Sequence, residues 1–254
     1  VAGPIELPVV ALPLRLRLDA LYIGNAAIVT APDSEPLHLQ DIALTASASG
    51  TRLTLTSLAL AAPGLTLRGN ASLEMQGDYP LQGALDWQWH PDALATLTAS
   101  THIECNLHRL VLSQDILPPY STHAELALID VLGTPQIDGT VALQDSALAA
   151  ISSDWPALRI STVLALAGPL EQLHISGSGD SRDAQGNRID ATPDAELQPA
   201  QLHIQTLQLT VPEQPTRLQV RGHVDFATAE PGFDLQADWQ ELAWPLHTEP
   251  VASS

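Results

Sequence analysis

Apolar and polar residues alternate along almost the whole of this 254-residue chain. Near the start, Leu12, Leu14, Leu16 and Leu18 alternate with a proline and two arginines, and the same period returns in most later stretches. Successive side chains of a β-strand point to opposite faces, so apolar side chains should lie on one face and Thr, Gln, Arg, Asp or Ser on the other. The pattern predicts an all-β fold whose sheet has one apolar and one polar face.

Turn signals interrupt the alternation at short intervals. Examples are AAPG near Gly64, EMQGDYP near Asp78, ILPPYS near Pro118 and AEPG near Gly232. Units of ~8 to 12 residues indicate consecutive antiparallel strands, and about twenty such units fit in the chain. Only the stretch DSALAAISSDWPAL has helical spacing. Its Pro156 and its β-rich surroundings favour a strand followed by a loop there.

A longer repeat relates two stretches, at about 65–88 and 218–240. LTLRGNASLEMQGDYPLQGALDWQ resembles LQVRGHVDFATAEPGFDLQADWQ, with Arg68-Gly69 matching Arg221-Gly222 and a shared Asp-Trp pair. Such a repeat indicates an elongated array in which each unit stacks on its neighbours. Because we find no linker, we expect residues 1–254 to form one continuous β-groove segment. The pattern still runs at both ends, so we also expect a longer parent protein.

The charge of the chain excludes most nucleic-acid binders. There are 29 acidic and 10 basic residues, giving a formal net charge of −19, and no basic residue is Lys. Polyphosphate binding needs clustered Lys and Arg, so we expect no nucleic-acid partner. The apolar runs are far shorter than the ~20 residues of a membrane-spanning helix. The single cysteine, Cys105, excludes an internal disulfide framework.

The apolar face of so long a sheet has to be covered. Exposed apolar patches beyond a few hundred Å² are rare in soluble proteins, which leaves a closed sandwich or barrel, or a gutter that holds a ligand. A packed sandwich core usually draws on aromatic residues, and here they make up only 4% of the chain. The composition therefore favours an open, strongly curved antiparallel sheet with an apolar concave face that suits acyl chains.

The residues predicted to line this groove are apolar members of the alternating stretches. They are Leu14, Leu16, Ile42, Leu44, Leu53, Leu55, Leu58, Leu60, Leu65, Leu67, Leu73, Leu85, Trp87, Ile103, Leu107, Leu126, Leu128, Val141, Leu143, Leu158, Ile160, Leu173, Ile175, Leu202, Ile204, Leu207, Leu209, Leu218, Val220, Phe226, Leu235 and Trp239. Four tryptophans, at positions 87, 89, 239 and 244, either seal the groove or pack beneath a turn, and the sequence leaves both possibilities open.

Sites for chemistry are weakly indicated. On a single strand, THIECNLH would put His102, Glu104, Asn106 and His108 on one face and Cys105 on the other, which argues against a mixed Cys and His zinc site. The acidic residues around Asp183 lack the spacing of a calcium loop. We expect no catalytic residues, no metal and no cofactor, and hence not an enzyme.

Several strings carry a family resemblance. LPLRLRLDALYIGNAAI, YPLQGALDW, DGTVALQDSALA and FDLQADWQELAWPL resemble the TamB-type translocation and assembly module proteins, within the AsmA-like group of repeating β-groove proteins. The resemblance implies a long antiparallel sheet curled into a taco-like groove. It also implies a parent protein that is anchored in the inner membrane and crosses the periplasm of Gram-negative bacteria.

The function implied is non-enzymatic passage of phospholipids between the inner and outer membranes. The implied partners are phospholipids and a TamA-like outer-membrane protein of the BamA family, contacted by regions outside this chain. The alternatives are a closed structural or adhesive β-sandwich, or a groove that assists outer-membrane protein assembly. The sequence does not distinguish lipid from polypeptide cargo.

Overall fold

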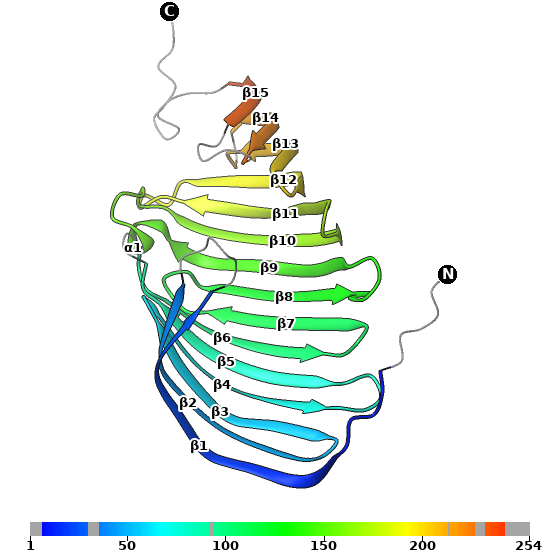
Figure 1. The fold of residues 1–254 in the computed structure, drawn as a ribbon. Helices are drawn as coiled ribbons and strands as arrows, with labels where there is room; N and C mark the ends of the chain where they lie inside the picture. The colour runs from blue at the N-terminus through cyan, green and yellow to red at the C-terminus, as the bar shows by residue number, and fades with distance from the viewer. Residues whose placement is uncertain (1–6, 30–35, 92–93, 213, 227–231, 242–254) are drawn as a thin grey trace, which may run out of the picture. The chain divides into compact units, whose positions relative to one another are not determined.

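The computed structural model describes residues 7–29, 36–91, 94–212, 214–226 and 232–241. Within these ranges, strands account for nearly all regular structure (Figure 1). The strands are β1 (Leu12–Ile28), β2 (Leu37–Gly50), β3 (Arg52–Ala62), β4 (Leu65–Glu74), β5 (Leu81–Trp89), β6 (Leu97–Cys105), β7 (Arg109–Ile116), β8 (Thr122–Ile129), β9 (Gln136–Ala147), β10 (Arg159–Pro169), β11 (Leu173–Arg182), β12 (Arg188–Gln198), β13 (Gln201–Thr210), β14 (Arg217–Asp225) and β15 (Gly232–Gln240).

All described strands belong to one sheet of fifteen strands, and their order in the sheet is their order in the chain. The sheet is open, and the strand pairs are antiparallel. The prediction of an all-β, open antiparallel sheet is therefore confirmed. The fifteen described strands are fewer than the approximately twenty expected. Long strands such as β1, with 17 residues, and β2, with 14, explain part of the difference.

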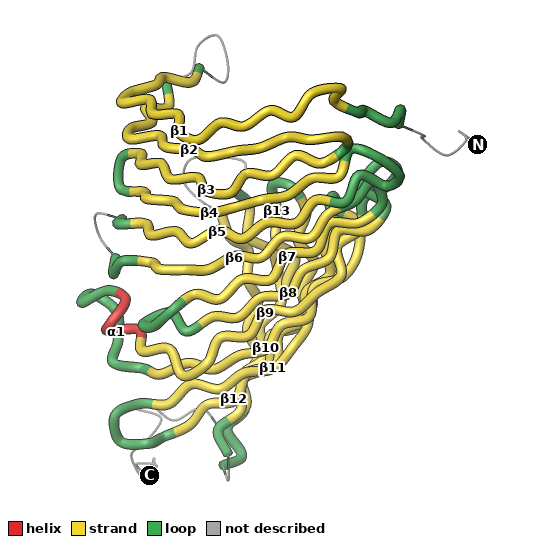
Figure 2. Tube along the Cα trace, turned by 90° about the horizontal axis from the view of Figure 1, so that it is seen from below, coloured by secondary structure: helices red, strands yellow, loops and turns green. Residues whose placement is uncertain are grey.

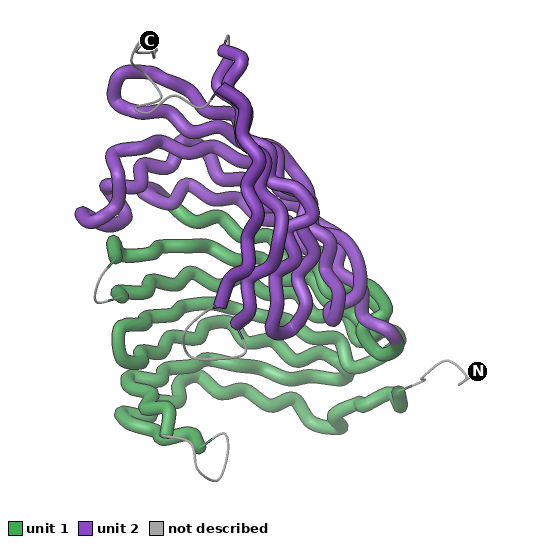
Figure 3. The backbone as a smooth tube through the Cα atoms, turned by 90° about the horizontal axis from the view of Figure 1, so that it is seen from above, with its two compact units in different colours: residues 1–117, 127–133 green, residues 118–126, 134–254 purple. Residues whose placement is uncertain are grey.

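The chain divides into two compact units, coloured separately in Figure 3. Unit 1 comprises residues 1–117 and 127–133, and unit 2 comprises residues 118–126 and 134–254. Within each unit the pairing of successive strands is regular enough to assign the face on which each side chain lies.

One helical turn follows β9 where we expected only a loop. The helix α1 (Leu148–Ile151) is the single red segment in Figure 2. Its Leu148 amide donates to the carbonyl of Leu158, 2.9 Å away, and Ile151 is buried. The prediction was wrong here because Pro156 lies beyond the turn and does not prevent it, while burial of Ile151 favours it.

Bulges keep the apolar residues on one face where the sequence slips out of phase. In β3, Leu55 and Leu58 are three residues apart, yet they pair with Ala71 and Gly69 of β4, which are two apart and share a face. Unit 2 has the same device between Ile204 and Leu207 of β13. A β-bulge inserts one extra residue and so restores the phase of the alternation.

The described part of the chain has almost no core. Its buried apolar residues are Ala48, Ala99, Ala127, Ile151, Leu173 and Ala195, four of them alanines. A domain of this length with a closed core would bury many Leu, Ile and Val side chains. No helix in the described ranges is long and apolar enough to cross a membrane.

Candidate functional site

In unit 1, the cross-strand register places the leucines of β1 to β7 on one face. Residues directly opposite each other in an antiparallel pair share a face, so the assignment passes from strand to strand. Leu53 lies opposite Leu73, Leu73 opposite Leu81, and Leu81 opposite Cys105. The predicted residues on this unit 1 apolar face are Leu16, Ile42, Leu44, Leu53, Leu55, Leu58, Leu60, Leu65, Leu67, Leu73, Leu85, Trp87 and Ile103.

Unit 2 has a corresponding apolar face across β9 to β15. Leu173 lies opposite Leu197, which lies opposite Leu202. The predicted residues on this unit 2 apolar face are Val141, Leu143, Ile160, Leu173, Ile175, Leu202, Ile204, Leu207, Leu209, Leu218, Val220, Leu235 and Trp239. Leu126 of β8 joins them, because its Cδ2 lies 2.8 Å from the position of a Cβ on Gly139.

Neither face holds a charged residue at the positions that this register assigns. Asp, Glu, Arg and His all fall on the opposite, polar faces, for example Arg68 and Asp86 in unit 1 and His174 and Glu196 in unit 2. The polar-face groups with shifted pKa values interact with polar neighbours. Hydrogen bonds from Gln198 and Gln172 lower the pKa of Glu196, and the Asp41 carboxylate raises the pKa of Tyr22, whose hydroxyl donates to it.

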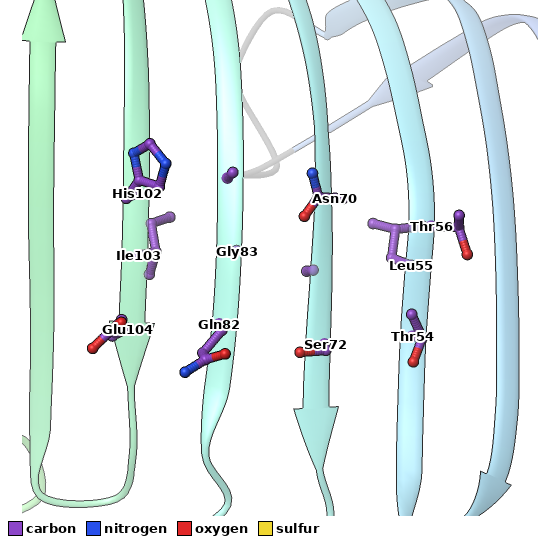
Figure 4. A pocket seen from close by; sticks show the side chains of 12 residues that line it. Thr54, Leu55, Thr56, Asn70, Ser72, Gln82, Gly83, His102, Ile103 and Glu104 are labelled. Atoms are coloured by element: carbon purple, nitrogen blue, oxygen red, sulfur yellow. The ribbon is translucent and has the colours of Figure 1, made fainter.

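A hollow of about 480 Å³ lies on the polar side of unit 1 (Figure 4). Hydroxyl and amide groups from four neighbouring strands line it, including Thr54, Asn70, Ser72 and Gln82, with His102 and Glu104 at one side. Leu55, Ala71, Ala84 and Ile103 line the hollow as well, so polar and apolar groups are mixed there. The register places its hydroxyl and amide groups on the face opposite the candidate lipid surface.

The apolar faces are partly shielded rather than buried. Leu67, Leu85 and Ile103 are half-buried, whereas residues at the first and last described strands are more open, with Leu16 54% and Trp239 66% exposed. Trp87 lies between β4 and β6, and its indole N–H donates to the Thr101 hydroxyl at 3.1 Å. An aliphatic surface that no second layer of described residues from its own unit covers can accept hydrocarbon.

Glycines let some leucines lie flat on these faces. Gly69 lies opposite Leu85, and a Cβ at position 69 would lie 2.5 Å from the Leu85 Cδ2. Gly222 lies opposite Leu235, and a Cβ there would overlap the carbonyl oxygen of Asp234. Only a residue without a side chain permits such close approach between strands.

Five predicted residues lie where the strand pairing does not assign a face. Leu14 falls in an irregular part of β1 and is 69% exposed, while Leu128 lies in β8. Leu107, Leu158 and Phe226 lie outside the strands, in the connections that follow β6, precede β10 and follow β14.

Other members of both apolar faces were not among the predicted lining residues. They include Leu18, Leu21, Ile23, Leu81, Trp89, Leu97, Leu110, Leu112, Ile116, Ile137, Leu164, Leu166, Ile189, Leu197, Val224 and Phe233. In β10 the cause is clear, because Val163, Ala165 and Ala167 make the other face apolar too and remove the alternation.

The segment THIECNLH is not a single strand. β6 ends at Cys105, and the Asn106 Oδ1 accepts hydrogen bonds from the amides of His108 (2.9 Å) and Arg109 (2.8 Å) in a tight turn. His102 and Glu104 share the polar face, but Asn106 and His108 belong to the turn. Leu110, the second residue of β7, lies directly opposite Cys105.

The acidic loop around Asp183 is a polar hairpin connection. The Asp183 carboxylate accepts hydrogen bonds from the amides of Gln185 and Asn187 and from the Asn187 side chain, at 2.7 to 2.9 Å. Among the residues that the structure describes, no three His, Cys, Asp or Glu side chains are gathered as ligands for one metal ion.

Comparison with known proteins gives one match. A family model described as the N-terminal domain of TamB matches residues 2–214, which confirms the resemblance drawn from the sequence strings. No curated protein and no solved structure matched the chain. Since the family match extends over more than half of the chain, and the open sheet agrees with it, this protein belongs to the TamB family.

Proposed function

We propose that this chain is a non-enzymatic segment of a lipid conduit, in which the apolar face of each unit shields phospholipid acyl chains from water. Membership of the TamB family implies a role in the translocation and assembly module, in lipid passage or outer-membrane protein assembly. The choice of lipid as cargo, and of the two apolar faces as its path, is the proposal.

The observation that carries the proposal is a long apolar surface without a core. Register puts the leucines of seven strands in unit 1 on one side, yet the buried apolar residues of the described chain are mainly alanines. A closed sandwich, the alternative, needs two facing sheets, and the described strands form one. An apolar surface this extensive is a binding surface in most soluble proteins.

Side-chain exposure supports a concave apolar side. In β5 the large residues Leu81, Leu85 and Trp87 are half-buried, whereas Gln82 and Asp86 on the other face are exposed. Side chains crowd one another on the inside of a bent sheet and spread apart on the outside. In β5, Trp89 at the strand end is exposed and Ala84 on the polar face is half-buried, so the shielding of the apolar face is strongest in the middle of the strand.

The proposed mechanism is passive. Each methylene group moved from water to an apolar surface gains ~0.8 kcal/mol, so a surface of hydrocarbon character removes most of the cost of carrying an acyl chain through water. The lining consists of repeated Leu, Ile and Val without charges at the assigned positions, so no position holds the chain much more tightly than the next. The headgroup stays in water at the open side.

The proposed setting follows from the family. The parent protein is anchored in the inner membrane and extends through the periplasm, and its TamA-like outer-membrane partner binds regions outside this chain. Phospholipid is the ligand of the present segment.

Lipid extraction and native mass spectrometry of the purified protein test the proposal directly. We expect phospholipid to copurify, and delipidation followed by incubation with vesicles should restore it. A protein that remains free of lipid under both conditions would contradict the proposal.

Charge insertion tests the path. Leu44→Asp, Leu73→Asp and Ile204→Asp each place a carboxylate on an apolar face, at a cost on the order of several kcal/mol wherever the acyl chain excludes water. Ser72→Asp and Gln208→Asp are matched controls, because both residues lie on polar faces. In the full-length protein, the first three variants should slow lipid passage and the controls should not. Equal rates in folded variants and controls would exclude this path.

Polypeptide cargo is the second candidate. β1 is the first described strand of the sheet, and Leu14 and Tyr22 on it are 69% and 66% exposed, so an extended segment of an outer-membrane protein would pair at this strand. Photocrosslinkers at Leu44 and at Leu14 separate the two cargoes. Lipid adducts at Leu44 support the conduit, and peptide adducts at Leu14 alone support the alternative.

A further inference from the structure

One polar pair interrupts the apolar face of unit 1. Across β4 to β7, the strand pairing assigns Leu, Ile, Trp, Ala, Gly and Cys to this face, with two exceptions, Thr101 of β6 and Gln114 of β7. These two residues lie directly opposite each other. Gln114 is the only Asn or Gln that the pairing of the described strands assigns to either apolar face. An amide among leucines and isoleucines therefore marks one place on an otherwise apolar surface.

Thr101 is fixed by its surroundings. It is only 6% exposed, and its hydroxyl oxygen accepts the 3.1 Å hydrogen bond from the Trp87 indole N–H. The hydroxyl proton is left to donate, and the cross-strand neighbour Gln114 is within reach of it. A side-chain amide has one acceptor oxygen and two N–H donors, so an amide that accepts from Thr101 keeps both donors for another group.

Gln114 is half-buried, and its side-chain amide has no hydrogen-bond partner among the residues that the structure describes. In the free protein, water can hydrogen-bond this amide. An acyl chain lying on the apolar face excludes that water, and a buried polar group without a partner is unfavourable. A ligand is therefore bound best when it brings a hydrogen-bond acceptor to Gln114.

The surroundings of Gln114 favour a neutral acceptor. Leu112 and Ile116 flank it along β7, and they lie opposite Ile103 and Ala99 of β6. The pairing assigns no charged side chain to this face, so a phosphate group would find no counter-ion beside Gln114. The ester carbonyls of a phospholipid fit this site, because they are neutral acceptors located where the acyl chains join the polar part of the molecule.

We propose that Gln114, oriented by Thr101, binds an ester carbonyl of the phospholipid and so fixes where the lipid pauses on the unit 1 apolar face. The inference rests on the proposed lipid conduit and adds to it a preference for ester-linked lipid. Gln114 is two residues from the end of β7, and Leu117, directly after that strand, is exposed. The headgroup can therefore reach water beyond the strand end while the acyl chains lie on the apolar face.

Competition between two lipids that differ only in this group tests the inference. Delipidated protein is equilibrated with vesicles that contain equal amounts of dioleoyl phosphatidylethanolamine and its diether analogue, which has no ester carbonyl, and the bound lipid is measured by mass spectrometry. We expect the wild type to hold about threefold to tenfold more of the ester lipid, the effect of one hydrogen bond. Gln114→Leu should hold the two lipids equally, and Thr101→Val should reduce the preference in part.

Gln82→Leu is the matched control, because Gln82 lies on the polar face of β5, opposite Ser72 and Glu104. It should keep the ester preference, and circular dichroism establishes that each variant folds. Equal amounts of both lipids on the wild type would overturn the inference and leave the conduit intact. An unchanged preference in folded Gln114→Leu, or its loss in folded Gln82→Leu, would do the same. Absence of both lipids from the wild type would refute the conduit and the inference together.

Discussion

The hairpin of β4 and β5 in unit 1 and the hairpin of β14 and β15 in unit 2 have related sequences but differ in register. In both, a glycine lies opposite a leucine, Gly69 with Leu85 and Gly222 with Leu235. Trp87 then lies opposite Leu67. Trp239 lies opposite Leu218, whose sequence counterpart in the first hairpin is Leu65. The repeated sequence therefore specifies the face and the glycine contact, but not the pairing of every residue.

The two tryptophans show what surrounds each hairpin. β5 is paired on both sides, and Trp87 is half-buried with its N–H bonded to Thr101 of β6. β15 is the last strand of the sheet in the described chain, and Trp239 is 66% exposed. The same residue type on the same face thus has a packing role in one hairpin and an open surface in the other.

The largest expected effect comes from filling the glycine positions. Gly69→Val places a branched side chain against Leu85 and should cost about 1 to 3 kcal/mol of local stability. Gly222→Val should cost about 2 to 4 kcal/mol, because Gly222 also has a φ of 141° that disfavours any side chain. Hydrogen exchange of β4 and β14 amides measures both. Gly77→Ala is the control, because Gly77 has a positive φ but no atom within 4 Å of an added Cβ. Equal losses of stability at all three positions would show that contact with the neighbouring strand is not the cause.

Truncating the tryptophans comes next. Trp87→Ala should lower the free energy of unfolding of its hairpin by about 2 kcal/mol, since the ring is half-buried and its hydrogen bond is lost. Trp239→Ala should cost less than about 1 kcal/mol, because most of that ring is already in contact with water. Denaturant unfolding monitored by hydrogen exchange compares the free energies of unfolding of the two hairpins. Equal losses in the two variants would show that the neighbouring strands do not determine how much each tryptophan contributes.

A smaller effect should come from transferring a charge pair between the hairpins. Arg68 lies opposite Asp86, whereas Arg221 lies opposite Gln236 because of the altered register. Gln236→Asp should stabilise the second hairpin by a few tenths of a kcal/mol, and Asp86→Asn should destabilise the first by a similar amount. Both effects should shrink in high salt. A salt-independent change would indicate that packing, not charge, is responsible.

The smallest expected effect is on the pH dependence of stability in unit 1. A hydrogen bond from the Thr51 hydroxyl, and then Arg52, whose Nε is 3.2 Å from the Glu74 Oε2, hold the pKa of Glu74 below its usual value. A carboxylate with a lowered folded-state pKa stabilises the protein above its unfolded-state pKa. That contribution is lost as the pH falls through the folded value. The melting temperature should therefore fall more steeply between about pH 6 and pH 3 for the wild type than for Glu74→Gln.

The fold was predictable because alternation is a local property of the sequence. Leu53, Leu55, Leu65, Leu67 and Leu73 were each placed by period two, and bulges absorbed the phase slips between them. The missed residues Leu164 and Leu166 lie where both faces of the strand are apolar, so alternation had nothing to detect.

The cross-strand neighbours of individual residues could not be found from the sequence. His203 and His223, for example, are twenty residues apart in the chain and lie directly opposite each other in β13 and β14. Their meeting depends on cross-strand register, which turns and bulges determine together.

Strand order that follows chain order has a consequence for how such proteins change length. Each strand is hydrogen-bonded to the strands immediately before and after it in the chain, and the described residues share no central core. Gain or loss of one hairpin therefore requires only two new neighbours to fit together. A gene encoding this architecture can be lengthened or shortened two strands at a time without rebuilding the rest of the sheet.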